Sequence, residues 1–113
     1  MKYEINKELI NAILDDEIKD IYFAPNGRFF ETWNGVIDNR VNINDFFFMC
    51  KEWANKNEYR LLTGSHDYNN QIICNIYKDF DYIDDYCEQI KSESEQQAVF
   101  DACQWILENK VTK

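Results

Sequence analysis

The segment NINDFFFMCKEWANKNEYRL, residues 42–61, separates two β-like regions and decides the fold class. Within it, apolar side chains recur at the three- and four-residue spacing of a helix. This stripe consists of Phe46, Met49, Cys50, Trp53 and Ala54. Asn42 precedes the stripe as an N-cap, Asp45 follows in a box-like arrangement, and the polar run around Asn57 suits a C-cap. The pattern therefore predicts a helix that is followed by a strand over 59–63.

The region before this helix is typical of one helix and a β meander. Residues 7–17 carry an apolar helical stripe behind Asn6, a fair N-cap. The three acids that end this helix oppose its dipole, so they either face a partner or are solvated. Strands are predicted over 18–24, 28–33 and 36–41, with an Asn-Gly turn signal in each interval. We expect Phe29 or Phe30, together with Trp33, to contribute to the core.

Two further strands are predicted after the central helix, over 59–63 and 72–77. The loop GSHDYNN between them, residues 64–70, is rich in turn-forming residues. Apolar side chains alternate along the second strand and share one face at Ile72, Cys74 and Ile76. This alternation predicts a sheet of which one face is buried.

The segment SESEQQAVFDACQWILENK predicts a closing helix over 95–109. Ser94 and Gln97 have the spacing of a capping box, and Ser92 with Glu95 is an alternative frame. The expected buried stripe consists of Ala98, Val99, Ala102, Cys103 and Ile106. The acidic run 79–91 before this helix fits either a continuing strand or a short helix.

The order of these elements predicts a two-layer α+β fold. Its antiparallel sheet is expected to have about four to five strands, with about three helices packed on one face. A chain of 113 residues has the usual size of one domain, so residues 1–113 are interpreted as a single α+β domain.

The net charge of −9, from 21 acids against 12 bases, limits the classes of partner. It disfavours direct binding to nucleic acid, because phosphates repel an acidic surface. It favours a basic protein partner, with plain solubility as the alternative. We find no apolar run of about 20 residues and no signal-peptide core, so we expect no membrane partner and a cytoplasmic location.

Catalytic, cofactor and metal motifs are missing from the sequence. The four cysteines form no C-x-x-C, the cytoplasm favours reduced thiols, and the three glycines are isolated turn residues. His66 is the only histidine, and its neighbours Ser65 and Asp67 are too close in sequence to form a triad with it. A nucleophile pair of His66 with Cys74 or Cys87 is the alternative that the sequence leaves open. We therefore expect a protein that is not an enzyme and holds no cofactor or metal.

The densest acidic and aromatic run is the expected partner-binding site. It consists of Asp79, Asp81, Tyr82, Asp84, Asp85, Tyr86 and Glu88. Its spacing does not match a calcium loop, whereas tyrosines and carboxylates suit a basic groove. The alternative is a solvated edge with aromatic side chains pointing inward. Phe47 and Phe48 lie off the helical stripe and suggest a second possibility, a structural or assembly homodimer.

Two helices resemble those of small uncharacterised accessory proteins of bacteriophages and prophages, including those of Campylobacter-type bacteria. The central helix matches their C-K-x-W-A pattern followed by a tyrosine strand, at Cys50, Lys51, Trp53, Ala54 and Tyr59. The closing helix matches a second pattern at Ser94, Glu95, Ala98, Ala102, Cys103, Trp105, Ile106 and Leu107. The resemblance covers about a third of the chain. It implies an accessory protein that acts by binding, such as an inhibitor of a basic CRISPR effector (an anti-CRISPR protein).

Overall fold

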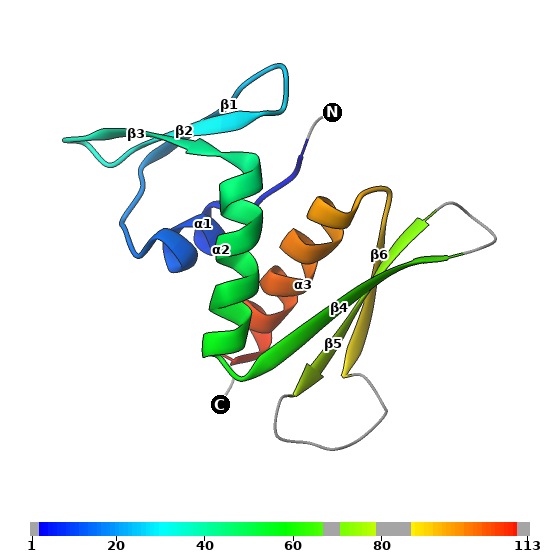
Figure 1. Ribbon diagram of the computed structural model, residues 1–113. Coiled ribbons are helices and arrows are strands. Elements are labelled where there is room, and N and C mark those ends of the chain that lie inside the picture. The colour runs from blue at the N-terminus through cyan, green and yellow to red at the C-terminus, as the bar shows by residue number, and fades with distance from the viewer. Residues whose placement is uncertain (1–2, 67–70, 79–86, 111–113) are drawn as a thin grey trace.

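The computed structural model describes residues 3–66, 71–78 and 87–110 (Figure 1). Its elements, in chain order, are α1 (Lys7–Leu14), β1 (Asp20–Phe23), β2 (Phe29–Trp33), β3 (Asp38–Asn42), α2 (Ile43–Lys56), β4 (Tyr59–His66), β5 (Gln71–Lys78), β6 (Glu88–Ser92) and α3 (Glu95–Lys110). The α+β class is therefore confirmed. No helix in these ranges is long and apolar enough to cross a membrane.

The strands form two antiparallel sheets, which we name the N-terminal sheet (β1-β2-β3) and the C-terminal sheet (β4-β5-β6). The prediction of one sheet of four to five strands with the helices on one face is therefore wrong. The reason is α2, which begins directly where β3 ends and runs for 14 residues, about 21 Å. The N-terminal sheet lies across the beginning of α2, whereas β4 starts at its far end (Figure 1).

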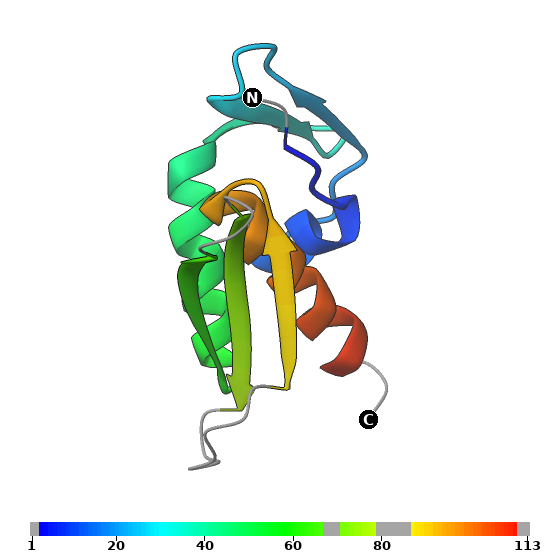
Figure 2. The same cartoon turned by 90° about the vertical axis from the view of Figure 1, so that its right-hand side faces the viewer.

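Helices α2 and α3 cover one face of the C-terminal sheet, as Figure 2 shows from the side of the strands. The buried face of β5 carries Cys74 and Ile76, each fully buried, as the alternation predicted. The predicted stripe of α3 is also confirmed, because all of its members are fully buried: Ala98, Val99, Ala102, Cys103 and Ile106. Phe100, which was not predicted for the core, is buried beside them.

A row of aromatic rings joins the N-terminal sheet to the helices. Phe30 of β2 lies 5.2 Å from Phe46 of α2, and Phe46 lies 5.6 Å from Phe100 of α3, measured between ring centroids. Phe23 of β1 and Tyr3 extend this row at its two ends, at 5.6 Å from Phe30 and 5.8 Å from Phe100. The inner face of the N-terminal sheet therefore shares one core with the helices.

The predicted N-caps are confirmed. Asn6 Oδ1 accepts from the amide of Glu8, and Asn42 Oδ1 accepts from the amides of residues 44 and 45. Ser94 Oγ accepts from the amide of Gln97. The side chain of Gln97 instead pairs with both backbone groups of Glu4, at 2.9 and 2.7 Å. This pair fastens the N-terminal segment to α3.

Several predicted boundaries shift for local reasons. The first helix ends at Leu14, not at residue 17, because Asp15 adopts a left-handed conformation with φ 53°. Strand β4 continues to His66, into the segment that was predicted to be a loop, because it pairs along the whole length of β5. The last residues of the run 79–91 belong to strand β6, and residues 79–86 lie outside the described part of the chain.

Candidate functional site on the outer face of the N-terminal sheet

The pairing register divides the N-terminal sheet into two faces, because directly opposed residues point to the same side. Phe30 and Thr32 are 0% and 3% exposed, so their side defines the inner face. The alternate positions define the outer face: Asp20, Tyr22, Phe29, Glu31, Trp33, Asp38, Arg40 and Asn42. In Figures 1 and 2 this sheet lies across one end of the helices, and none of the drawn helices or strands covers its outer face.

Large apolar side chains are exposed on this face and on the turn beside it. Tyr22 of β1 is 66% exposed, and Trp33 of β2 is 41% exposed. The turn between β2 and β3 adds Val36 and Ile37, at 85% and 55%. The prediction that Trp33 lies in the core is therefore wrong. Because Trp33 and the buried Phe30 are three residues apart on one strand, their side chains point to opposite faces.

Carboxylates surround these aromatic side chains. Asp20 and Asp38 are the cross-strand neighbours of Trp33, one on each side, and Glu31 is the neighbour of Tyr22. The outer face thus carries three carboxylates and one guanidinium, that of Arg40. Tyrosine and tryptophan give rigid contact area, and carboxylates attract cationic groups. The arrangement is suited to holding a protein surface that carries positive charge.

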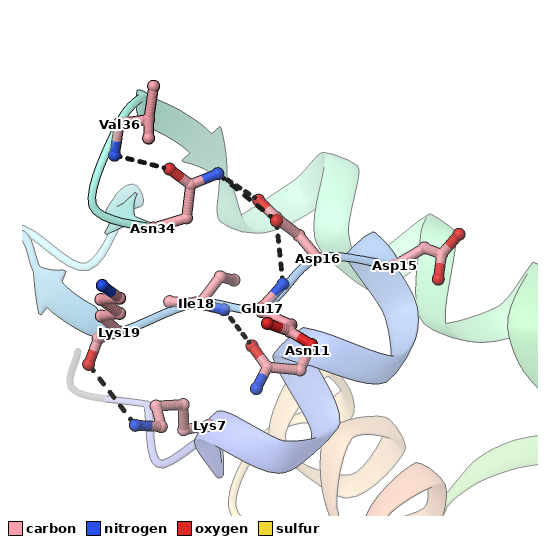
Figure 3. A pocket seen from close by; sticks show the side chains of 9 residues that line it. All are labelled: Lys7, Asn11, Asp15, Asp16, Glu17, Ile18, Lys19, Asn34 and Val36. Atoms are coloured by element: carbon pink, nitrogen blue, oxygen red, sulfur yellow. Dashed lines mark hydrogen bonds between the residues drawn. The ribbon is translucent and has the colours of Figure 1, made fainter.

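An open cleft of about 750 Å³ adjoins the exposed turn, between the end of α1 and β1 (Figure 3). The Asp16 carboxylate accepts from the amide of Glu17 at 2.8 Å and from Asn34 Nδ2 at 3.2 Å. Asn34 Oδ1 in turn accepts from the amides of Val36 and Ile37, at 3.0 and 2.9 Å. These bonds fix the exposed turn to the end of α1.

On the other side of this cleft, side chains of α1 form hydrogen bonds with backbone groups of residues 18 and 19. Asn11 Oδ1 accepts from the amide of Ile18, and Lys7 Nζ donates to the carbonyl of Lys19. Asp16, Asn34 and Asn11 therefore have structural roles. The acids that follow α1, Asp15, Asp16 and Glu17, line this cleft together with the two lysines.

Burial makes three of the four cysteine thiols unsuitable as nucleophiles. Cys50, Cys74 and Cys103 are fully buried and free, and Cys103 Sγ donates to the carbonyl of Cys50 at 3.4 Å. Burial raises the pKa of Cys74 to about 12, and burial together with Cys103 raises the pKa of Cys50 further. A thiol with such a pKa stays protonated and unreactive at neutral pH. Cys87 is exposed, and among the described residues no group of three or more His, Cys, Asp or Glu side chains could hold a metal ion.

Most of the partner-binding residues predicted from sequence lie outside the described residues, namely Asp79, Asp81, Tyr82, Asp84, Asp85 and Tyr86. Glu88 opens β6 opposite Ile76 and is half-buried, with Oε1 accepting from the amide of Gln89. The two phenylalanines proposed for a dimer differ: Phe47 is only 6% exposed, whereas Phe48 is 61% exposed.

The exposed apolar side chains Tyr22, Trp33, Val36 and Ile37 were not predicted from the sequence. The signal for the first two was the two-residue period of β1 and β2, which places Tyr22 and Trp33 on the side opposite Phe30. The solvent exposure of Val36 and Ile37 has no such signal, since apolar residues next to an Asn-Gly turn fit a buried strand equally well. Comparisons of the chain with protein-family models, with curated proteins and with solved structures gave no match.

Proposed function

We propose that this protein acts by binding a basic protein through the outer face of its N-terminal sheet. The observation that supports this most is the pair of exposed aromatic side chains, Tyr22 and Trp33, among the carboxylates of Asp20, Glu31 and Asp38. Tryptophan and tyrosine are the side chains that most often dominate binding energy at interfaces. The carboxylates speed encounter with a positively charged partner and favour one orientation of it.

The class of partner follows from the charge of the whole chain and from the resemblance of two helices to phage and prophage accessory proteins. With a net charge of −9, the chain is repelled by nucleic acid itself and attracted to proteins that bind nucleic acid. We propose that the partner is a nucleic-acid-handling host factor, for example a CRISPR effector. Occupying its basic channel would inhibit it by excluding the nucleic acid.

Capture of the partner from host lysate by immobilised protein tests this function. We expect a basic protein to be captured at low salt, and the double variant Tyr22→Ser, Trp33→Ser to lose it, since each hot-spot side chain contributes about 2 kcal/mol or more. Phe48→Ser is the matched control, because it removes an aromatic side chain whose exposed fraction lies between those of Trp33 and Tyr22 from another surface. Capture of the same protein by the double variant would contradict the proposal.

The acidic run 79–88 is a second candidate surface for the same partner. Its support is its charge and its tyrosines in the sequence. The variant Asp81→Asn, Asp84→Asn, Asp85→Asn separates the two surfaces in the same capture experiment. Loss of capture by this variant alone would assign binding to the acidic run, and unchanged capture at low salt would remove that run from the interface.

A structural or assembly homodimer is the alternative function. The exposed ring of Phe48, which packs against Phe47 at 5.5 Å, supports it. Because Phe47 is buried, such an interface would rest on Phe48 and its surroundings. Light scattering at tens of micromolar tests it: a dimeric mass that Phe48→Ser abolishes would support the dimer, and a strict monomer would remove it.

A further inference from the structure

A pocket that is lined by two arginines lies at the end of the N-terminal sheet that is far from Trp33. It has a volume of about 450 Å³ and lies where β2 begins, β3 ends and α2 starts. Its lining residues are Asn26, Arg28, Phe29, Arg40, Asn42 and Asp45. Two of the three arginines in this acidic chain therefore line one pocket.

The side chain of Arg40 and the backbone of Arg28 are held by their surroundings. The guanidinium carbon of Arg40 lies 3.6 Å from the centre of the Phe29 ring. Stacking of this kind occupies the face of a guanidinium and not its N–H edge. The backbone of Arg28 is fixed on both sides, because its amide donates to Asn26 Oδ1 and its carbonyl accepts from the amide of Ile43, both at 2.9 Å. Less conformational freedom is then lost when the pocket binds an anion.

The amide side chains in the pocket add hydrogen-bond donors. Asn26 and Asn42 both use Oδ1 as an acceptor for backbone amides, so the amide nitrogen of each side chain is the group that can still donate. The same bonds occupy the amides of residues 44 and 45. An anion in this pocket would therefore be held by side chains and not by the N-terminus of α2.

We propose that this pocket binds a phosphate group, either as free inorganic phosphate or as the terminal group of a small phosphate ester such as a nucleotide. Phosphate carries a charge between −1.5 and −2 at neutral pH and three strong acceptor oxygens, which match two guanidinium groups. A carboxylate offers one charge and two oxygens, and so would leave donors unused. Asp45 also lines the pocket, and its negative charge is expected to weaken anion binding there.

Titration of the 113-residue chain, followed by amide chemical shifts in ¹⁵N–¹H spectra at constant ionic strength, tests this site. The probes are inorganic phosphate and adenosine monophosphate, in separate titrations. We expect saturable shifts at residues 26–29 and 40–45. Arg28→Gln or Arg40→Gln should weaken binding about tenfold, and Asp45→Asn should strengthen it severalfold, because these changes remove a charge-assisted bond and a like charge, respectively.

Arg60→Gln is the matched control. Arg60 also stacks on an aromatic ring, that of Tyr77 at 5.3 Å, but it lies on the C-terminal sheet. Tighter binding of the nucleotide than of phosphate would identify an ester as the ligand, and equal affinities would identify free phosphate. Absence of saturation at about 20 mM, or an equal loss in Arg60→Gln, would overturn the proposal. Because neither titration involves a protein partner, its outcome is independent of the function proposed above.

Discussion

At the scale of single residues, the buried thiol of Cys74 links the packing of the core to pH. Its pKa is raised from 9.0 to about 12, first by burial and then by Cys103 and Glu95, while Lys51 lowers it. In the unfolded chain the thiol ionises near its ordinary value. The protonated, folded form is therefore favoured fully below pH 9.0, and this contribution is lost as the pH rises toward about 12.

We therefore predict that the free energy of unfolding falls between pH 9 and 11 and that Cys74→Ala makes this fall shallower. Denaturation by urea at several pH values measures both effects, at an expected slope of up to about 1.4 kcal/mol per pH unit for one proton. Because the two proteins differ only at Cys74, the comparison between wild type and variant carries the test. Equal slopes in the two proteins would show that Cys74 does not contribute.

Some side-chain environments could be predicted from the sequence and others could not. The caps Asn6, Asn42 and Ser94 were predictable, because each bond joins groups two or three residues apart in sequence. Trp33 was not placed correctly, because either face of a strand can be the buried one until its partner elements are known. The burial of Phe30 fixes that choice and turns Trp33 outward.

At the scale of elements, the first turns of helix α2 join the N-terminal sheet to helix α3. Its three consecutive phenylalanines have different environments, since Phe46 is fully buried, Phe47 is 6% exposed and Phe48 is 61% exposed. Phe46 lies between Phe30 of the N-terminal sheet and Phe100 of α3. This one side chain therefore joins three elements.

We predict that Phe46→Ala lowers the free energy of unfolding by about 3–5 kcal/mol, the range for a large ring removed from a packed core. Phe48→Ala should change it by less than about 0.5 kcal/mol, as for other exposed positions. Urea denaturation of the two variants measures the difference. Similar losses in both would contradict the row of rings as the connection between the N-terminal sheet and the helices.

The division into two sheets could not be read from the sequence. The order of helices and strands was predicted closely, because periodicity and turn signals are local. Which strands pair is set by contacts between distant segments, and the sequence offers no local signal that separates β3 from β4. The length of α2 decides that β3 and β4 belong to different sheets, because this helix carries the chain from one end of the helical layer to the other.

At the scale of the whole molecule, the buried residues of both sheets belong to one cluster. Phe30 of the N-terminal sheet and Ile76 of the C-terminal sheet contact the same helical core. We predict that the chain unfolds as one cooperative unit, as the interpretation of residues 1–113 as one domain requires. Amide exchange in β2 and β5 under increasing urea should reach a common free energy, and earlier exchange throughout β2 would indicate a separate unit.

The two ends of the N-terminal sheet give the molecule an uneven distribution of charge. Carboxylates gather around Trp33, and Arg28 and Arg40 line the pocket at the other end. The sequence predicted a net acidic surface and a basic partner, but it placed the expected site in the run 79–88. Scattered arginines such as Arg28 and Arg40 become neighbours only through the pairing of β2 with β3.

Hydroxyl-radical footprinting of the protein with its captured partner tests the central proposal most directly, because it reports the exposure of individual aromatic side chains. Tyr22 and Trp33, which are 66% and 41% exposed in the free chain, should be oxidised readily alone and protected in the complex. Phe48, at 61% exposed, should be oxidised equally in both. Protection of Phe48 or of residues 79–88, with Tyr22 and Trp33 oxidised as in the free chain, would contradict binding through the outer face of the N-terminal sheet.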